Sequence, residues 1–228
     1  MIWKFLNEGE NSGGFNMKRD LDIAGNISPD ETVLRLYRWK PYCISLGANQ
    51  IKNEIDFKKT DEAGIDVVKR PTGGRAILHA EELTYAVIMP LSEGSSARNI
   101  YRDINLALLE GLKKFDIRLA EAGLEENQPD FPEIYRKESK STLCFAVSAK
   151  NELKFGGKKL VGSAQRKLGR VILQHGSALS CGIRPSSALV RAAACLRMPN
   201  ACTTSRGMRS RSPPMAKNLR LRAVWAPQ

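Results

Sequence analysis

The chain has 228 residues, of which 42% are hydrophobic, and its 36 Lys and Arg against 24 Asp and Glu give a formal net charge of +12. This length suits one large domain or two small ones. The apolar runs are far shorter than the ~20 residues that a membrane helix needs, and the N-terminus lacks the apolar core of a signal peptide. We therefore expect a cytoplasmic protein with reduced thiols and no membrane partner.

The positive charge is concentrated toward the C-terminus. Residues 178–228 contain nine Lys or Arg and no acid, whereas residues 1–177 contain 27 basic and 24 acidic residues. A charge this close to neutral over 1–177 argues against a nucleic-acid-binding protein. We expect a folded domain over 1–177 and an atypical basic tail over 178–228. The tail is either a natural segment for an acidic partner or the product of a shifted reading frame, which the abrupt loss of acids favours.

Strand and helix patterns alternate in the first third of the chain. The sequence predicts strands at 2–6, 33–39, 42–46 and 65–68, a polar turn at 8–14, a helix over 15–24 and a short helix from Asp56 to Gly64. Pro41 separates the second strand from the third.

The pattern changes after residue 70. The sequence predicts a loop at 70–75, a strand at 83–89, a helix beginning at Ser96, a surface loop over 120–142, a hairpin of 152–155 and 159–165, and a strand at 171–174. Several strands are close enough in sequence to be antiparallel. We therefore expect an α/β (α+β) fold with a single mixed-sheet domain.

A glycine-rich loop, Arg70-Pro-Thr-Gly-Gly-Arg75, lies between two predicted strands. Adjacent glycines let a ligand approach the backbone closely, and their N–H groups can bind an anion or a carbonyl oxygen. The two arginines would add positive charge beside that ligand. The alternative is a tight surface turn with solvated arginines.

Lys159 precedes a run of small residues, Gly162-Ser163-Ala164. A lysine on a strand next to such a run can polarise a carbonyl group or stabilise an oxyanion. The small residues would leave a narrow slot for an acyl chain. The alternative is a solvated lysine on a hairpin, which is the more common situation for this residue type.

Two further residues can carry chemistry. Cys144, followed by Phe145, offers a thiolate that exchanges with thioesters, although a lone cysteine is usually a small buried hydrophobe. His175 is either a base, a polar wall of a pocket or a satisfied core histidine. Five cysteines without a paired spacing and only two histidines predict no metal site.

The motifs occur in an order that is specific even though each one is weak. The segments RPTGGRAILH, ELTYAV, CF, GKKLVGSAQR and LQHGS resemble the lipoate–protein ligase A and octanoyltransferase family. WKPYCISLG and the Asn16-Met17 pair also look like that family. The resemblance covers residues 1–177 and implies the fold of biotin and lipoate protein ligases, which is related to the catalytic cores of class II tRNA synthetases.

The resemblance also implies roles for individual residues. Lys159 would contact the carbonyl of the activated acyl group, and Cys144 would be the nucleophile. The acyl pocket would be lined by Arg70, Thr72, Gly73, Gly74, Arg75, His79, Gly162, Ser163, Ala164, Gln165 and His175.

Two chemistries share such a pocket in the family. Ligases activate lipoate with ATP and Mg, whereas transferases take octanoate from acyl carrier protein through a cysteine thioester and need no cofactor. Arg75 stands where ligases tend to have a third glycine, and Cys144 stands where transferases have their nucleophile. The resemblance therefore implies an octanoyltransferase, with an ATP-dependent ligase as the alternative. Its partners would be octanoyl-acyl carrier protein and lipoyl-domain proteins, namely the glycine cleavage H protein and 2-oxoacid dehydrogenase E2 subunits.

Overall fold

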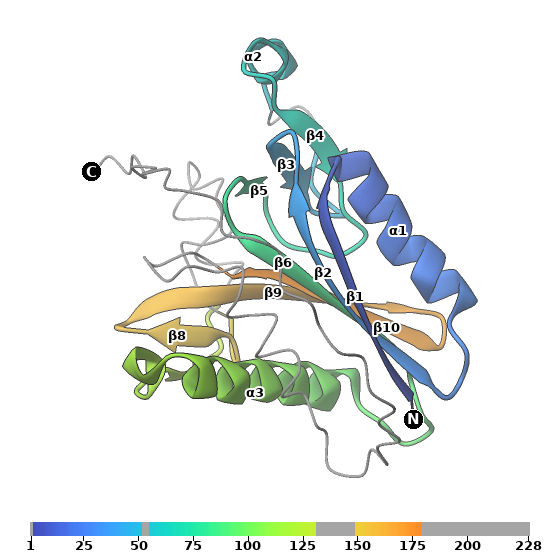
Figure 1. The fold of residues 1–228 in the computed structure, drawn as a ribbon, viewed down its shortest axis with the longest axis vertical. Coiled ribbons are helices and arrows are strands. Elements are labelled where there is room, and N and C mark those ends of the chain that lie inside the picture. Colours follow the sequence, from blue (N-terminus) through green and yellow to red (C-terminus); the bar gives the residue numbers. More distant parts are fainter. Residues whose placement is uncertain (1, 52–54, 131–148, 179–228) are drawn as a thin grey trace, which may run out of the picture.

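The computed structural model describes residues 2–51, 55–130 and 149–178, which form two sheets and three α-helices (Figure 1). The larger sheet has seven strands in the order β1-β2-β6-β10-β9-β8-β7, and the smaller has three in the order β4-β3-β5. The strands are β1 (Ile2–Asn11), β2 (Glu31–Trp39), β3 (Cys43–Leu46), β4 (Asp66–Lys69), β5 (Ile77–His79), β6 (Leu83–Pro90), β7 (Gly123–Leu124), β8 (Leu153–Phe155), β9 (Lys158–Leu168) and β10 (Val171–Ala178). The helices are α1 (Gly13–Asn26), α2 (Phe57–Glu62) and α3 (Ala97–Phe115), with a 3-10 turn at Ile117–Leu119.

The larger sheet is mixed, as the sequence predicted. β1 and β2 run parallel, and the other neighbouring pairs described in this sheet run antiparallel. The expected α/β fold class is therefore confirmed, and the domain has a second, smaller sheet in addition. None of the helices in the described ranges is both long and apolar enough to cross a membrane.

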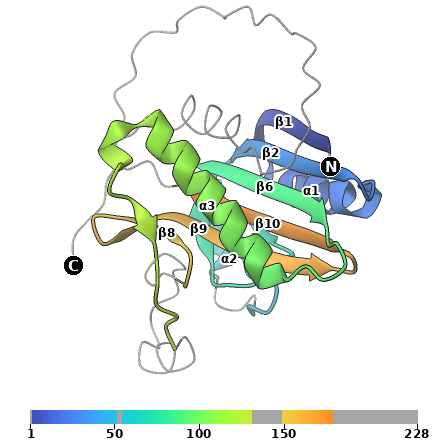
Figure 2. The ribbon, with the colours of Figure 1, turned by 90° about the horizontal axis from the view of Figure 1, so that it is seen from below.

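Helices α1 and α3 cover opposite faces of the larger sheet (Figures 1 and 2). Alternate residues of β2 explain this arrangement, because side chains on a strand point to opposite faces. Leu34 and Leu36 are buried in the cluster that contains α3, whereas Val33 and Tyr37 are buried in the cluster that contains α1. The sheet is thus a central layer with an apolar core on each side.

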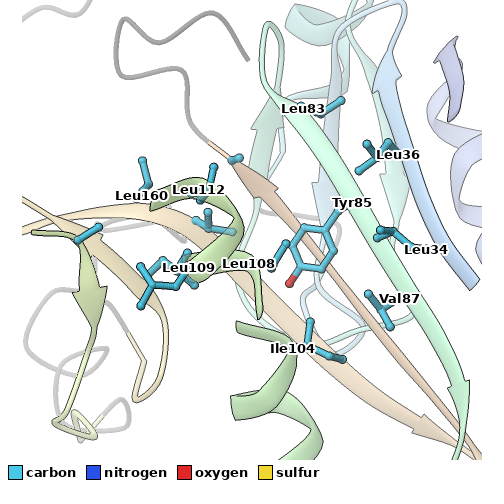
Figure 3. Packing of buried hydrophobic residues seen from close by; sticks show 14 of the residues in the cluster. Leu34, Leu36, Leu83, Tyr85, Val87, Ile104, Leu108, Leu109, Leu112 and Leu160 are labelled. Atoms are coloured by element: carbon cyan, nitrogen blue, oxygen red, sulfur yellow. The ribbon is translucent and has the colours of Figure 1, made fainter. Parts of the chain in front are cut away.

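The α3 core is built from the helical repeat of apolar residues that the sequence shows. Ile104, Leu108 and Leu112 lie one turn apart on α3 and pack toward Tyr85 and Leu36 of the sheet (Figure 3). Each such buried side chain contributes roughly 1.5–3 kcal/mol to folding. This packing fixes α3 against the sheet, including β9 and β10, which carry Lys159, residues 162–165 and His175.

Most of the predicted elements are confirmed. Ser96 is the N-cap of α3 and Asp56 is the N-cap of α2. The predicted hairpin forms β8 and β9, joined by Gly156 and Gly157 with φ of 55° and 73°. Both values lie in the left-handed region that glycine tolerates best.

Two predictions need correction, and one strand was missed. The polar turn at 8–14 is wrong, because β1 continues to Asn11 and α1 already begins at Gly13. β1 is an edge strand, where polar residues can face solvent or pair with neighbours, and Glu8 pairs with Arg35. The loop predicted over 120–142 contains the two-residue strand β7, and its part beyond residue 130 lies outside the described residues. The three-residue strand β5 was not predicted.

Candidate active site

The glycine-rich loop is held from within by the side chain of Arg70. Arg70 is 3% exposed, and its guanidinium donates to the carbonyl oxygens of Ser45, Gly73 and Arg75 at 2.7, 2.9 and 2.7 Å. The planar fork of arginine suits several acceptors at once. Arg70 is therefore not one of the solvated arginines of a simple surface turn, and it determines the shape of the loop.

Gly47, at the end of β3, allows the loop to approach the small sheet. A Cβ atom at this position would lie 1.8 Å from the carbonyl oxygen of Gly74, which is far too close. The backbone N–H of Ala48 donates to the carbonyl of Thr72 at 2.9 Å. On the other side, Arg166 of β9 donates to the carbonyl of Pro71 at 2.6 Å. The loop therefore lies between the small sheet and β9.

Thr72 and His175 are in direct contact beneath this loop. Thr72 Oγ1 lies 2.6 Å from His175 Nε2, and His175 Nδ1 lies 3.2 Å from Asp20 Oδ2 of α1. Asp20 also accepts from Arg35 Nη1 at 2.7 Å and from the Tyr37 hydroxyl at 3.2 Å. Hydroxyl, imidazole, carboxylate and guanidinium thus form one buried chain that joins the loop to β10, α1 and β2.

His79 forms a second chain of the same kind. Its Nε2 lies 2.7 Å from Ser45 Oγ, its Nδ1 is bonded to Glu82, and its ring stacks on Trp39 with centroids 3.9 Å apart. Burial lowers the pKa of His79 in spite of the Glu82 hydrogen bond, and the nearby Arg70 charge acts in the same direction as burial. A neutral imidazole is therefore favoured at this position.

Lys159 is buried and paired, unlike a solvated hairpin lysine. Its Nζ lies 2.8 Å from Glu152 Oε2, and the two side chains are 5% and 4% exposed. Glu152 also accepts from the backbone N–H groups of Ala149 and Ser163 at 2.6 and 3.2 Å. Burial raises the pKa of Glu152, whereas the Lys159 charge and these N–H groups act against that rise.

Ser163 is fixed at each of its polar atoms. Besides the bond from its N–H to Glu152, its hydroxyl donates to Asn105 Oδ1 at 3.0 Å and lies 2.7 Å from the Tyr85 hydroxyl. Its carbonyl accepts from the Tyr101 hydroxyl at 3.2 Å. Burial raises the pKa of Tyr85 to about 12, which keeps this phenol protonated. The middle of β9 is therefore held rigidly against α3 and β6.

Gln165 extends the same group, since it donates to Gln174 Oε1 at 3.2 Å. Gly162 and Ala164 lie directly opposite Ser177 and His175 in the β9–β10 pair. Directly opposite residues share a face of the sheet. These two small residues therefore lie on the side of the glycine-rich loop, whereas Ser163 and Gln165 lie on the side of α3.

The structure thus places the predicted residues in two groups, one around the glycine-rich loop and one along β9. The first contains Arg70, Thr72, Gly73, Gly74, Arg75, His79 and His175, and the second contains Lys159, Ser163 and Gln165. Cys144 lies outside the described residues, so its position relative to Lys159 stays a prediction. Within the described ranges, no three His, Cys, Asp or Glu side chains are grouped as a metal site requires.

Sequence reasoning missed several partners of these residues. Asp20 lies on α1 four residues after Asn16, and Glu152 is a single acid at the start of the predicted hairpin. Among these partners, only Glu82 had a signal in the sequence, because it follows its partner His79 by three residues. An isolated acid becomes informative only when the fold shows that it is buried next to a cation.

The comparisons with known proteins agree with the fold and with the motifs. A family model described as the lipoyl protein ligase A/B catalytic domain matches residues 12–216. Octanoyltransferase LipM of Staphylococcus aureus is 39% identical over 185 residues, which cover 78% of this chain and 65% of the relative. Octanoyltransferase LipM of Clostridioides difficile is 36% identical over 182 residues, covering 77% of this chain and 64% of the relative. The chain therefore spans just under two thirds of the length of these relatives.

Solved structures share the fold at lower sequence identity. A lipoate-protein ligase A bound with ATP superposes with a TM-score of 0.63 and 22% identity, covering 78% of this chain and 67% of that one. Protein Ta0514 of T. acidophilum with bound lipoic acid gives a TM-score of 0.62 and 23% identity, with the same coverage of 78% and 67%. On the extent of the family match and the identity to its relatives, this chain belongs to the lipoyl protein ligase A/B catalytic domain family.

Proposed function

We propose that this protein transfers an octanoyl group to a lysine of a lipoyl-domain protein through a thioester on Cys144. The observation that carries the proposal is its similarity to several octanoyltransferases, at 35–39% identity over about four fifths of the chain. The buried Lys159–Glu152 pair, on the hairpin that follows Cys144 in sequence, supplies a fixed positive charge for such chemistry. The glycine-rich loop supplies a backbone that a substrate can approach closely.

In the first half-reaction, the Cys144 thiolate attacks the carbonyl carbon of octanoyl-acyl carrier protein. A C–S bond forms, the carbonyl oxygen becomes negative, and the Lys159 ammonium together with backbone N–H groups stabilises that charge. Collapse of the intermediate breaks the C–S bond to the carrier, which leaves as a thiolate and takes up a proton. The octanoyl group is then held on Cys144 as a thioester.

In the second half-reaction, a neutral lysine amine of the lipoyl-domain protein attacks the same carbonyl carbon. A C–N bond forms, the amine loses a proton to water, and Cys144 leaves as a thiolate. An amide is more stable than a thioester, so the transfer needs neither ATP nor metal. The expected donor and acceptor are octanoyl-acyl carrier protein and proteins such as the glycine cleavage H protein.

Chain connectivity is compatible with this chemistry. Glu152 Oε2 accepts from both Ala149 N–H and Lys159 Nζ, at 2.6 and 2.8 Å. Cys144 precedes Ala149 by five residues, and five extended residues span at most ~18 Å. The length of the chain between Cys144 and Ala149 therefore sets no obstacle to the proposed roles of Cys144 and Lys159.

The test uses the full chain with octanoyl-acyl carrier protein and the glycine cleavage H protein. We expect the mass of the H protein to increase by one octanoyl group, and the enzyme alone to form a hydroxylamine-sensitive acyl adduct at Cys144. Cys144→Ser should lose both signals. Full transfer by Cys144→Ser would refute the thioester route.

The competing function is an ATP-dependent lipoate ligase with Mg, which the family model also covers. Incubation with radiolabelled ATP and lipoate distinguishes the two functions. A labelled lipoyl-adenylate, formed equally by the original chain and by Cys144→Ser, would favour the ligase.

We propose that residues 1–177 carry the catalytic domain and that 178–228 are an atypical basic tail. The family match to residue 216 extends into this tail, whereas the curated relatives match 78% of the chain. Resequencing the coding DNA across codons 175–185 tests for a shifted reading frame.

A further inference from the structure

Two buried polar side chains of α1, Asn16 and Asp20, hold the guanidinium of Arg35 on β2. They lie four residues apart and therefore on the same face of the helix. Arg35 Nη2 donates to Asn16 Oδ1 at 2.7 Å, and Arg35 Nη1 donates to Asp20 Oδ1 at 2.7 Å. One carboxylate oxygen of Asp20 is thus committed to a buried cation, and this contact sets the direction of the other oxygen.

The second oxygen of Asp20 faces the imidazole of His175. Asp20 Oδ2 lies 3.2 Å from His175 Nδ1 and accepts from the Tyr37 hydroxyl at 3.2 Å. A carboxylate paired with a guanidinium can only accept hydrogen bonds. In this contact, His175 Nδ1 therefore carries a proton and donates it to Asp20.

Thr72 indicates the same tautomer from the other side of the ring. The residue is 0% exposed, and its hydroxyl lies 2.6 Å from His175 Nε2. Among the residues that the structure describes, this hydroxyl has no other hydrogen-bonding partner. A hydroxyl has one proton to donate, and a buried donor without an acceptor is costly. Both contacts are satisfied when Thr72 donates to an unprotonated Nε2.

We propose that Asp20 is a positioning residue, which keeps the proton of the His175 ring on Nδ1 so that Nε2 accepts from Thr72 and the glycine-rich loop is held for octanoyl transfer. This inference rests on the proposed function and deepens it, because it gives α1 a part in shaping the acyl site. It also gives a role to Asn16, since Asn16 and Arg35 together orient Asp20.

The opposite tautomer would disturb the loop. Nε2 would then donate to Thr72, and the proton of the Thr72 hydroxyl would be left without an acceptor beneath the loop. Gly73 and Gly74 follow Thr72 directly in the chain. A shift of Thr72 therefore moves the backbone N–H groups that we expect to bind the acyl carbonyl.

The tautomer can be measured directly, because the chain contains two histidines. Full-length protein labelled with nitrogen-15 in histidine gives two imidazole patterns by NMR, and His79→Gln identifies the one that belongs to His175. At about pH 8, above the ordinary pKa of histidine, we expect Nδ1 of His175 to be protonated and Nε2 to be unprotonated. A protonated Nε2 in the original chain overturns the inference.

Asp20→Asn should reverse the pattern. Its amide oxygen is needed by Arg35, so the NH₂ group faces His175 Nδ1 and can only donate to it. The ring proton must then move to Nε2. Asp22→Asn is the matched control on the same helix, since its pair with Lys18 is largely exposed, and it should leave the pattern unchanged. An unaltered His175 pattern in Asp20→Asn contradicts the proposal.

Thr72→Val carries the test if Asp20→Asn fails to fold. It removes the contact at Nε2 and leaves Asp20 in place, so the proton should stay on Nδ1. Movement of the proton to Nε2 in this variant would mean that Thr72 sets the tautomer, and the role of Asp20 would be refuted.

Kinetics test whether the tautomer matters for transfer. With octanoyl-acyl carrier protein and the glycine cleavage H protein, Asp20→Asn should lower kcat by roughly tenfold to 10²-fold, as expected for a displaced binding group. The KM for the carrier protein should change little. In Thr72→Val, adding Asp20→Asn should lower kcat much less, because the hydroxyl through which Asp20 acts is already absent. Equal losses in the two backgrounds would show that Asp20 acts only on general stability.

The measurements separate a failure of this inference from a failure of the proposed function. If the original chain transfers no octanoyl group and Asp20→Asn still reverses the His175 pattern, the proposed function fails and the control of the tautomer stands. If transfer is normal and the pattern does not reverse, the inference alone is wrong.

Discussion

Thr72 Oγ1 lies 2.6 Å from His175 Nε2, although 103 residues separate them in the chain. Because the other nitrogen of His175 faces Asp20, this contact ties the glycine-rich loop to the sheet and to α1 together. The loop is thus anchored by a side chain at its centre as well as by the Arg70 clamp at its start.

Thr72→Val should destabilise the protein, because valine keeps the shape of threonine but leaves a buried nitrogen of His175 without its partner. The expected cost is roughly 1–3 kcal/mol in the free energy of unfolding, measured by urea denaturation. Thr72→Ser retains a hydroxyl and should cost less. Equal losses in the two variants would show that the hydrogen bond contributes nothing.

Asp20→Asn should have a larger effect, because it removes a charge that pairs with the fully buried Arg35. Breaking a buried ion pair from one side costs roughly 3–5 kcal/mol, and the remaining Glu8 partner of Arg35 places the expected value at the lower end. Asp22→Asn is the control, since its pair with Lys18 is largely exposed and should contribute less than about 1 kcal/mol. Equal stability of the two variants in urea denaturation would contradict the prediction.

Gly47→Ala should displace the glycine-rich loop, because the new Cβ would lie 1.8 Å from the carbonyl oxygen of Gly74. Overpacking of this kind costs roughly 1–3 kcal/mol, and we expect octanoyl transfer to fall with it. Gly25→Ala is the control, because nothing lies within 4 Å of a Cβ there and the residue is helical. Comparable thermal stability and transfer rate in both variants would mean that the loop adapts without cost.

Stability should decrease as the pH falls through the range around 6.5, the ordinary pKa of histidine. Burial lowers the pKa of His79 in the folded protein, so the unfolded chain takes up this proton first. A group of this kind destabilises the fold increasingly as the pH drops from its unfolded pKa to its folded pKa. His79→Gln should show a shallower dependence on pH in urea denaturation between pH 7.5 and 5. A curve parallel to that of the original chain would exclude His79 as the cause.

The sequence predicted the elements with strong periodicity and the loops with glycine, because these depend on local chemistry. The apolar repeat of α3 and the Gly156-Gly157 turn are examples that the structure confirms. β5 was missed because three residues show no usable alternation.

The site could be predicted only in part. Motif residues such as His175 and Lys159 were found by resemblance, whereas their partners Asp20 and Glu152 were not. The fold decides which residues become partners, and these can be far apart in the chain. A single acid in a polar segment therefore gives no indication, in the sequence, of the cation with which it will pair. The buried ion pairs therefore had to be read from the structure.

Side chains along β10 alternate between the two faces of the sheet, so the contacts on both faces depend on the same strand register. Gln174 faces the α3 core, and the next residue, His175, faces the glycine-rich loop. Sliding this strand by a single position would exchange the two sides, leaving an imidazole under the helix and an amide under Thr72. The site of Gly176 disfavours such a slip, because a neighbouring residue would move into it and no side chain fits so close to Gly162 and Tyr85. A chain paired in this wrong register would thus lose the buried contacts on both faces of the strand at once.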